Sequence, residues 1–283
     1  MVALGLGVKA WSVEKCIQTF EGLVKDAFTP RTGIRFLRPL VIGFKASKYE
    51  TKPLEGALAK AFGTDEYLFG GRRPSAQYES TKKVIVMTTS SGMPVALSNY
   101  GRHVPPEKLT YHYQRGETEE KELKIWEAAR ATSAAPFFFK PFEHKGTGQT
   151  YLDGALFHNN PICIALRERQ LLWPDEPCEL PDLILSLGTG MAPERKVQEQ
   201  CIPPERAHQW LPGFLGCMLQ TAKDHFAMAL NCENIWKNFV ESQSRSWDLS
   251  RFHRFNPVLV GDVPSLDAVD QMKSIQAQHG QNL

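Results

Sequence analysis

WEAARATSAAPFFF, at residues 126–139, leads into YLDGAL at residues 151–156 and then into NNP at residues 159–161. These stretches predict a helix, an aromatic run, a loop and the start of a second helix. We expect the first helix from about Glu119 to Ser133, stopped by Pro136. The small residues near its end permit close backbone packing. The aromatic run that follows is predicted to enter the core.

Outside these stretches, helical patterns alternate with continuously apolar strand patterns. After Trp11, apolar residues recur in steps of three and four, which predicts an amphipathic helix that Ser12 caps and that ends before Pro30. The further expected elements are a helix at 53–62, strands at 39–44, 83–88, 95–98, 182–187 and 252–257, a helix after residue 161, and helical structure from 205 to about 242. This alternation predicts an α/β layered domain.

Composition excludes several classes of protein. Lys and Arg number 33 against 31 Asp and Glu, a formal net charge of +2, which argues against a nucleic-acid partner. No apolar run approaches the roughly 20 residues of a spanning helix. The six cysteines have neither C-x-x-C spacing nor a zinc pattern. We therefore interpret them as reduced thiols of an intracellular protein and expect no metal.

Asp153 lies in the loop between the two predicted helices. Gly154 follows it, and we expect this glycine to adopt dihedral angles that other residues avoid. A carboxylate held in such a loop acts either as a general base or as a group that orders its own turn. Spacing alone favours the turn. Asn160 is predicted to cap the following helix, with Pro161 in its first turn.

Four blocks of the sequence, in this order, resemble the patatin-like phospholipases, and the first block resembles the fungal members in particular. The blocks are ALGLGVKAWSVEKCIQTFEGLVKDAFTPR at 3–31, ARATSAAP at 129–136, YLDGALFHNNP at 151–161 and LILSLGTG at 183–190. The resemblance implies a three-layer α/β/α domain over residues 1–190. It also implies hydrolysis of acyl esters in phospholipids or other lipids, without a metal or another cofactor.

The same resemblance implies a role for Asp153. The family uses a Ser–Asp dyad, with the serine in a G-x-S-x-G elbow and the aspartate in a D-G-[GA] motif. Asp153, Gly154 and Ala155 match the second motif, so Asp153 takes the part of the proton acceptor. The family also has a glycine-rich oxyanion loop near the start of its domain.

Two parts of that machinery are absent from the printed sequence. It contains no G-x-S-x-G and no early glycine-rich oxyanion loop. The apolar opening at 1–8 resembles the helix that the elbow launches, so we expect a patatin-like domain truncated at its N-terminus and lacking its first strands. Because an aspartate base without a serine has no nucleophile to activate, we expect no acyl transfer from this chain as written.

Other candidates have a stronger structural interpretation. Ser90 and Ser91 follow a strand, but without the glycine two residues earlier that an elbow needs. Packing is the favoured role for Ser133, and a surface position for His158. The phenylalanines at 137–139 could line an acyl-chain pocket, but core packing is the favoured role. The loop at 188–190 suggests a phosphate site but lacks the full motif. Burial is favoured over a membrane interface for the apolar cluster Trp210, Leu211, Phe214, Leu215 and Met218.

Taken together, these patterns predict a patatin-like domain at 1–190 followed by a mostly helical continuation at 191–283. The expected protein is cytoplasmic and contacts phospholipid, at most as a peripheral membrane protein. Two alternatives stay open beside the acyl hydrolase. One is a catalytically inactive remnant that binds lipid or a partner, and the other is a fragment of an incompletely described gene.

Overall fold

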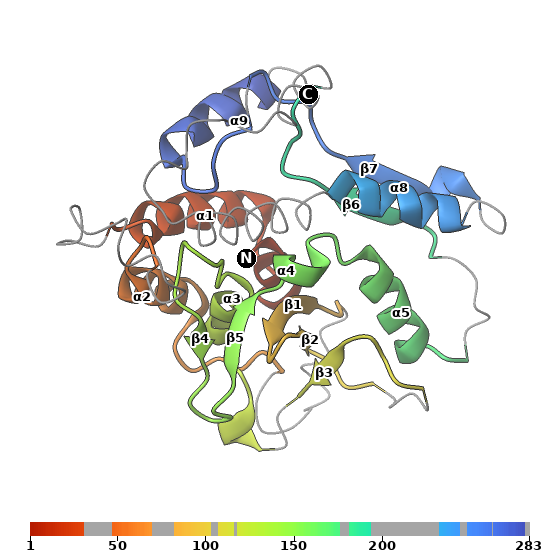
Figure 1. Cartoon of the computed structure of the whole chain (residues 1–283), viewed down its shortest axis with the longest axis horizontal. Coiled ribbons are helices and arrows are strands. Elements are labelled where there is room, and N and C mark those ends of the chain that lie inside the picture. Colours follow the sequence, from red (N-terminus) through yellow and green to blue (C-terminus); the bar gives the residue numbers. More distant parts are fainter. Residues whose placement is uncertain are drawn as a thin grey trace, which may run out of the picture. The chain divides into compact units, whose positions relative to one another are not determined.

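The computed structural model describes residues 1–30, 47–69, 82–102, 107–115, 118–175, 181–193, 232–243, 248–261 and 263–280. The chain divides into two compact units, Met1–Trp173 and Pro174–Leu283, whose elements are labelled in Figure 1. The boundary predicted at residue 190 lies within the second unit and stays a prediction. The strand expected at 39–44 and the apolar cluster at 210–218 lie outside the described residues.

A five-stranded mixed sheet forms the centre of the first unit. In spatial order, its strands are β3 (His112–Gln114), β2 (Met93–Ser98), β1 (Ile85–Ser90), β5 (Thr150–Asp153) and β4 (Phe142–Glu143). β1 pairs antiparallel with both β2 and β5, β4 pairs antiparallel with β5, and β2 pairs parallel with β3. The strands predicted at 83–88 and 95–98 are confirmed as the β1–β2 hairpin.

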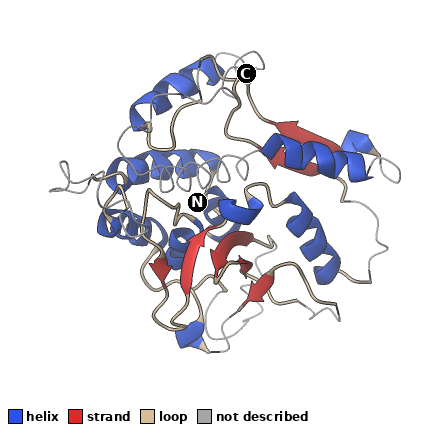
Figure 2. Ribbon diagram, in the orientation of Figure 1, coloured by secondary structure: helices blue, strands red, loops and turns tan. Residues whose placement is uncertain are grey.

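Three helices drawn in blue in Figure 2 stack in turn on one side of this sheet: α3 (Ile125–Thr132) packs against β1 and β5, α2 (Thr51–Phe62) packs against α3, and α1 (Val13–Ala27) packs against α2. α1 begins where the sequence predicts, because Ser12 Oγ accepts a hydrogen bond from Lys15 N at 3.2 Å. The main core forms between these helices and the sheet. It includes Leu54, Leu58 and Phe62 of α2, Ala128 and Ala131 of α3, and Val86, Val95 and Leu97 of the hairpin.

α5 (Ile162–Leu172) covers the opposite face. Its Ile164 packs in a second core with Met87, Ala96 and Tyr111. Because successive strand residues point to opposite faces, Val86 and Met87 belong to different cores. Helices therefore lie on both faces of the sheet, and the expected three-layer α/β/α arrangement is confirmed in the first unit.

The helix expected from Glu119 to Ser133 is in fact two elements. A 3-10 turn, η2, covers Glu119–Lys121, and α3 begins only at Ile125. Between them the chain is extended and pairs with the segment after α2, where Leu68 N donates to Leu123 O at 2.9 Å. Tertiary pairing thus overrides a local helical pattern.

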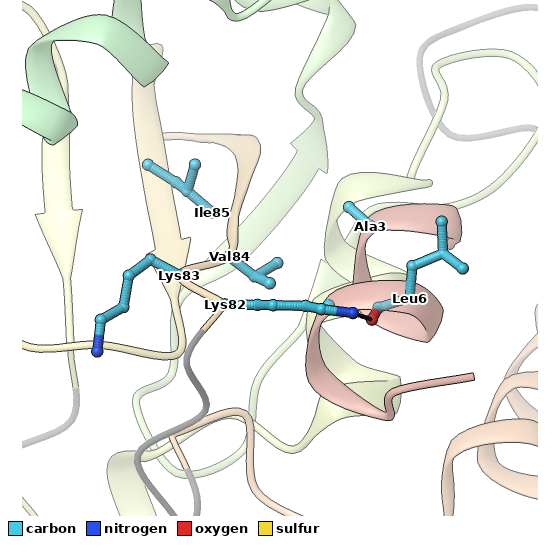
Figure 3. A pocket seen from close by; sticks show the side chains of 7 residues that line it. Ala3, Leu6, Lys82, Lys83, Val84 and Ile85 are labelled. Atoms are coloured by element: carbon cyan, nitrogen blue, oxygen red, sulfur yellow. Dashed lines mark hydrogen bonds between the residues drawn. The ribbon is translucent and has the colours of Figure 1, made fainter. Parts of the chain in front are cut away.

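The N-terminal stretch forms a π-helical turn, η1 (Leu4–Val8), against the start of β1. A methyl group on Gly7 would lie 2.2 Å from Val84 Cγ2, so the close approach requires glycine. Beside this contact is a solvent-open hollow of about 340 Å³, shown in Figure 3. The Lys82 side chain extends across this hollow, and its Nζ donates to Leu6 O at 3.2 Å.

The second unit contains the strands predicted at 182–187 and 252–257. They are β6 (Ile184–Leu187) and β7 (Phe252–Phe255), which pair in parallel. α8 (Cys232–Gln243) packs Phe239 against Phe252, with ring centroids 5.8 Å apart. The other described elements of this unit are η3 (Leu249–Arg251), η4 (Val269–Gln271) and α9 (Met272–Gly280).

A buried charge cluster joins α5 to the segment between β2 and β3. Glu168 and Arg102 have side chains that are 2% and 3% exposed, and Arg102 Nε lies 2.9 Å from Glu168 Oε1. Tyr100 and Tyr111 donate their hydroxyl hydrogens to the same carboxylate. The Arg102 guanidinium also lies 4.1 Å from the centroid of the Tyr113 ring. A buried carboxylate with this many partners holds α5 firmly against the sheet.

We expect Glu168→Ala to lower the free energy of unfolding by about 3–5 kcal/mol, because it leaves the Arg102 charge buried without its partner. Urea denaturation followed by circular dichroism measures this loss. Glu66→Ala is the matched control: it breaks an ion pair with Lys9 in which the Glu66 side chain is 52% exposed, and should cost less than about 1 kcal/mol. Equal losses in the two variants would contradict the prediction.

Candidate functional site

Asp153 is the last residue of β5, which pairs with β1, the central strand of the sheet. β5 pairs with β1 at this point, with Thr88 opposite Asp153 and Thr89 opposite Leu152. Asp153 N donates to Ala134 O, just after α3, at 3.1 Å. Residues that lie far apart in the sequence therefore fix the aspartate backbone. The structure thus brings the end of the ARATSAAP stretch and Asp153 together.

The Asp153 side chain is partly buried and has no cationic partner among the described residues. Its Oδ1 accepts one hydrogen bond, from Ala155 N at 2.7 Å. Burial raises the pKa of the Asp153 carboxyl from 3.8 to about 6, and the Ala155 N–H opposes part of that rise. A carboxylate with a pKa of this size is able to take and release a proton close to neutral pH.

The carboxylate also performs the structural role that spacing alone favoured. Its bond to the N–H two residues ahead is the Asx-turn pattern. The turn leads into the short helix α4 (Ala155–His158). Ordering this turn and accepting a proton are compatible roles, because Oδ2 takes no part in the bond to Ala155.

Gly154 is required for a different reason from the one expected. Its dihedral angles are φ −70° and ψ −22°, which any residue adopts, so the expectation of unusual dihedrals is wrong. A methyl group on residue 154 would instead lie 2.1 Å from the carbonyl oxygen of Met87 in β1. The backbone after Asp153 is pressed against the neighbouring strand, and only hydrogen fits between them.

Asn160 does not cap the helix that follows. Pro161 occupies the N-cap position of α5, and no side chain caps the helix there. Asn160 is buried at 9% exposure, one residue outside the cap. The predicted N-cap is therefore one residue too early, because the chain completes α4 before α5 begins.

The alternative nucleophiles lie in settings unlike an elbow. Ser90 and Ser91 belong to the β1–β2 hairpin, in which Ser90 pairs with Met93 and Ser91 has a φ of +50°. A hairpin joins two strands, whereas an elbow joins a strand to a helix. Ser133 Oγ donates to Ala129 O at 2.8 Å, one helical turn earlier, which fits the packing role. The bond described for the Asp153 carboxylate comes from Ala155 N and not from any of these serine hydroxyls.

His158 and the phenylalanine run differ from expectation in part. His158 is half-buried, and burial lowers its pKa. Phe138 and Phe139 pack around Tyr49 in the main core. Phe137 is 38% exposed with a φ of +71°, so it does not enter the core with its neighbours.

The backbone amides of the glycine loop after β6 already bind other protein groups. Gly188 N donates to Phe255 O at 2.8 Å, and Gly190 N donates to Asn256 Oδ1 at 2.8 Å. Two amides that a phosphate would need are thus engaged, which argues against the phosphate-loop interpretation. Among the residues described, no group of three or more His, Cys, Asp or Glu side chains is arranged to hold a metal ion.

Sequence reasoning missed two threonines of β1. Thr88 Oγ1 donates to Leu152 O at 2.6 Å, and Thr89 Oγ1 donates to Asp153 O at 3.0 Å. Their side chains are 1% and 3% exposed. The signal available in the sequence was a pair of polar residues at the end of an apolar strand, but nothing in it linked them to a segment 64 residues away.

We expect Gly154→Ala to destabilise the protein by about 1–3 kcal/mol, because the new methyl group overlaps the Met87 carbonyl. Gly22→Ala in α1 is the control: nothing lies within 4 Å of its new methyl group, and alanine there favours the helix by up to about 1 kcal/mol. Thermal unfolding measures both variants. A stable Gly154→Ala protein would show that the strand contact is looser than described.

Asp153→Asn should stabilise the protein at high pH and leave it unchanged at low pH. Because the pKa of the folded state is raised, ionisation costs stability between about pH 4 and pH 6, and the full cost is present above pH 6. Asparagine keeps the acceptor for Ala155 N but carries no charge. The gain should be about 1–3 kcal/mol at pH 8, after allowance for partial exposure, and near zero at pH 4.

Melting temperatures of Asp153→Asn between pH 4 and pH 8 test this expectation. Asp65→Asn is the control, because hydrogen bonds from Thr64 and Lys124 lower the pKa of this exposed carboxyl. It should give no gain at pH 8. A gain for Asp153→Asn that does not change with pH would contradict the assigned cause.

Comparison with known proteins matches residues 1–166 to the patatin-like phospholipase family. Calcium-independent phospholipase A2-gamma of Mus musculus is 25% identical over 271 residues, which are 96% of this chain and 31% of that protein. The Oryctolagus cuniculus protein of the same name is 29% identical over 190 residues, 67% of this chain and 22% of its own length. Phospholipase A I of Arabidopsis thaliana is 26% identical over 240 residues, 69% of this chain and 18% of its length.

The chain thus spans less than a third of the length of these relatives. The resemblance to fungal members in particular stays an expectation. The matched segment contains the whole described sheet of the first unit, both of its cores and Asp153. Since the match covers more than half of the 283 residues, the chain belongs to the patatin-like phospholipase family.

Proposed function

We propose that this domain serves the hydrolysis of acyl esters in phospholipids, with Asp153 as the proton acceptor. The observation that carries the proposal is the partly buried Asp153 carboxylate, which has a raised pKa and no cationic partner among the described residues. It sits in the D-G-A sequence of a chain that belongs to a lipid hydrolase family. An ion-paired structural carboxylate would instead have a lowered pKa.

The raised pKa suits the proposed chemistry. With a pKa of about 6, roughly nine in ten Asp153 side chains are ionised at pH 7, so the basic form dominates. The same value lies close enough to neutrality for the protonated form to return its proton. Burial thus gives the carboxylate a higher proton affinity than a solvated aspartate has.

The reaction also needs a nucleophile. We propose that a serine outside these 283 residues supplies it, because the printed sequence contains no G-x-S-x-G. In this scheme the serine oxygen attacks the acyl carbonyl and its proton passes to Asp153. The alcohol of the lipid then leaves with that proton, and water hydrolyses the acyl-enzyme with Asp153 again as base.

Two measurements test the proposal. The first is to read the native transcript upstream of the codon for Met1, where we expect in-frame sequence that encodes G-x-S-x-G. The second is to assay the full product on phospholipid vesicles by release of fatty acid. Asp153→Asn should lower its kcat by about 10²–10⁴-fold, and Asp65→Asn should leave it unchanged. An active protein that is insensitive to Asp153→Asn would contradict the role of Asp153.

The 283-residue chain by itself should hydrolyse vesicles no faster than buffer. Loss of the nucleophile in a serine hydrolase costs on the order of 10⁶ in kcat, and Asp153 alone does not replace it. Hydrolysis by this chain that disappears on Asp153→Asn would contradict the external serine. It would direct attention to a serine within the printed sequence.

The absence of the motif favours one second candidate function, which is lipid binding without turnover. This candidate predicts that the 283-residue chain floats with phosphatidylcholine vesicles in a density gradient while it releases no fatty acid. No helix of the described part of the chain is long and apolar enough to cross a membrane. We propose that any such contact is peripheral. A transcript without further upstream coding sequence, together with flotation, would favour binding over hydrolysis.

A further inference from the structure

Two adjacent hydroxyl groups of β1 bind the backbone of the segment that carries Asp153. Thr88 Oγ1 donates to Leu152 O at 2.6 Å and lies 3.3 Å from Ala131 O at the end of α3. Thr89 Oγ1 donates to Asp153 O at 3.0 Å. Both threonines are almost completely buried. Each hydroxyl therefore replaces its bond to water with a bond to the aspartate segment.

The two hydroxyls approach β5 from opposite sides. Successive residues of a strand point to opposite faces of the sheet, so Thr88 holds Leu152 from one face and Thr89 holds Asp153 from the other. The backbone pairing between β1 and β5 is short, since its register covers only Thr88 with Asp153 and Thr89 with Leu152. Side-chain bonds therefore supply much of the attachment that a longer ladder would give.

A third hydroxyl closes the arrangement. Thr132 Oγ1, at the end of α3, donates to Met87 O at 2.6 Å. That carbonyl oxygen is the atom against which Gly154 is pressed. These bonds join β1, β5 and the end of α3 at the residue that carries the carboxylate of the proposed reaction, Asp153.

We propose that Thr88 and Thr89 are positioning residues that hold Asp153 in its partly buried site through the backbone carbonyls of Leu152 and Asp153. This inference rests on the proposed role of Asp153 as proton acceptor. Neither threonine touches the reacting atoms in this scheme. Each acts on the carboxylate through the main chain, and so keeps it away from water.

Within the part of the chain that the structure describes, no charged group contributes to the shifted pKa of Asp153, whose causes are burial and the Ala155 N–H. The Thr88 and Thr89 hydroxyls of β1 bind backbone carbonyls, and the charged residues of α3 bind elsewhere, Glu127 to Lys124 N and Arg130 to Lys140 O. His158 ends α4, and its shifted pKa is caused by burial alone. Enclosure by the backbone is therefore the property that the hydroxyls would control, and burial is the main cause of the raised Asp153 pKa.

The test measures the protonation of Asp153 without any need for catalysis. The Ala155 amide donates to Asp153 Oδ1, so its proton and nitrogen chemical shifts should follow the carboxyl titration. We would record these shifts between pH 4 and pH 8 in the perdeuterated, ¹⁵N-labelled 283-residue chain. Asp153→Asn, which should abolish the transition, assigns the signal.

Thr88→Val keeps the shape of the side chain and removes its hydroxyl. We expect the Ala155 transition to move from about pH 6 toward the ordinary aspartate range, a fall of about one pH unit or more, because water reaches the carboxylate. Thr88→Ser restores a hydroxyl and should restore the midpoint. Ser98→Ala is the matched control: it removes another buried hydroxyl that donates to a backbone carbonyl, that of Tyr100, and should leave the midpoint unchanged.

An unchanged midpoint in folded Thr88→Val would overturn the proposal. So would equal shifts in Thr88→Val and Ser98→Ala, because these would report general loosening of the sheet. If Thr88→Val does not fold, Thr89→Val provides the same comparison through the bond to Asp153 O. Failure of the proposed hydrolysis is seen separately, because a wild-type chain without activity still reports its Asp153 midpoint.

Discussion

The candidate site and the junction of β1, β5 and α3 depend on one close contact, that between the backbone at Gly154 and the carbonyl oxygen of Met87. No side chain fits between them. The contact places the end of β5 directly against β1, and the hydroxyls of Thr88, Thr89 and Thr132 then hold the two strands and the end of α3 together. The position of Asp153 follows from this arrangement, because the aspartate precedes the glycine by one residue. Glycine is thus required here by space and not by backbone conformation.

This contact has an energetic cost at the carboxylate. An aspartate enclosed by backbone and without a cation is harder to ionise than one in water, and its pKa rises. A fold selected for stability alone would place an arginine or lysine beside such a group, or replace the group. The protein does pair a buried carboxylate fully elsewhere, since Glu168 has both Arg102 and tyrosine hydroxyls as partners. The difference between these two carboxylates distinguishes a structural acid from one suited to proton transfer.

Much of the fold followed from local patterns. The amphipathic helix after Ser12, the β1–β2 hairpin and the strands β6 and β7 lie where periodicity predicted them. The pattern was wrong where tertiary pairing competed with it: the segment before Ile125 pairs with the segment after α2 instead of starting the helix. Phe137 likewise leaves the aromatic run, because its backbone turns outward while its two neighbours pack around Tyr49.

The sequence by itself determined the α/β class and the family resemblance, because these rest on residue types and spacings that can be read along the chain. Through that resemblance it also pointed to Asp153 as the candidate proton acceptor. It also determined that no G-x-S-x-G occurs in the printed residues. Only the tertiary structure decided why Gly154 is needed, what raises the pKa of Asp153 and which hydroxyls hold its backbone. The physical reason is distance along the chain: Met87, Thr88 and Thr89 precede the D-G-A sequence by more than 60 residues. Their contacts with it arise only when β1 and β5 pair.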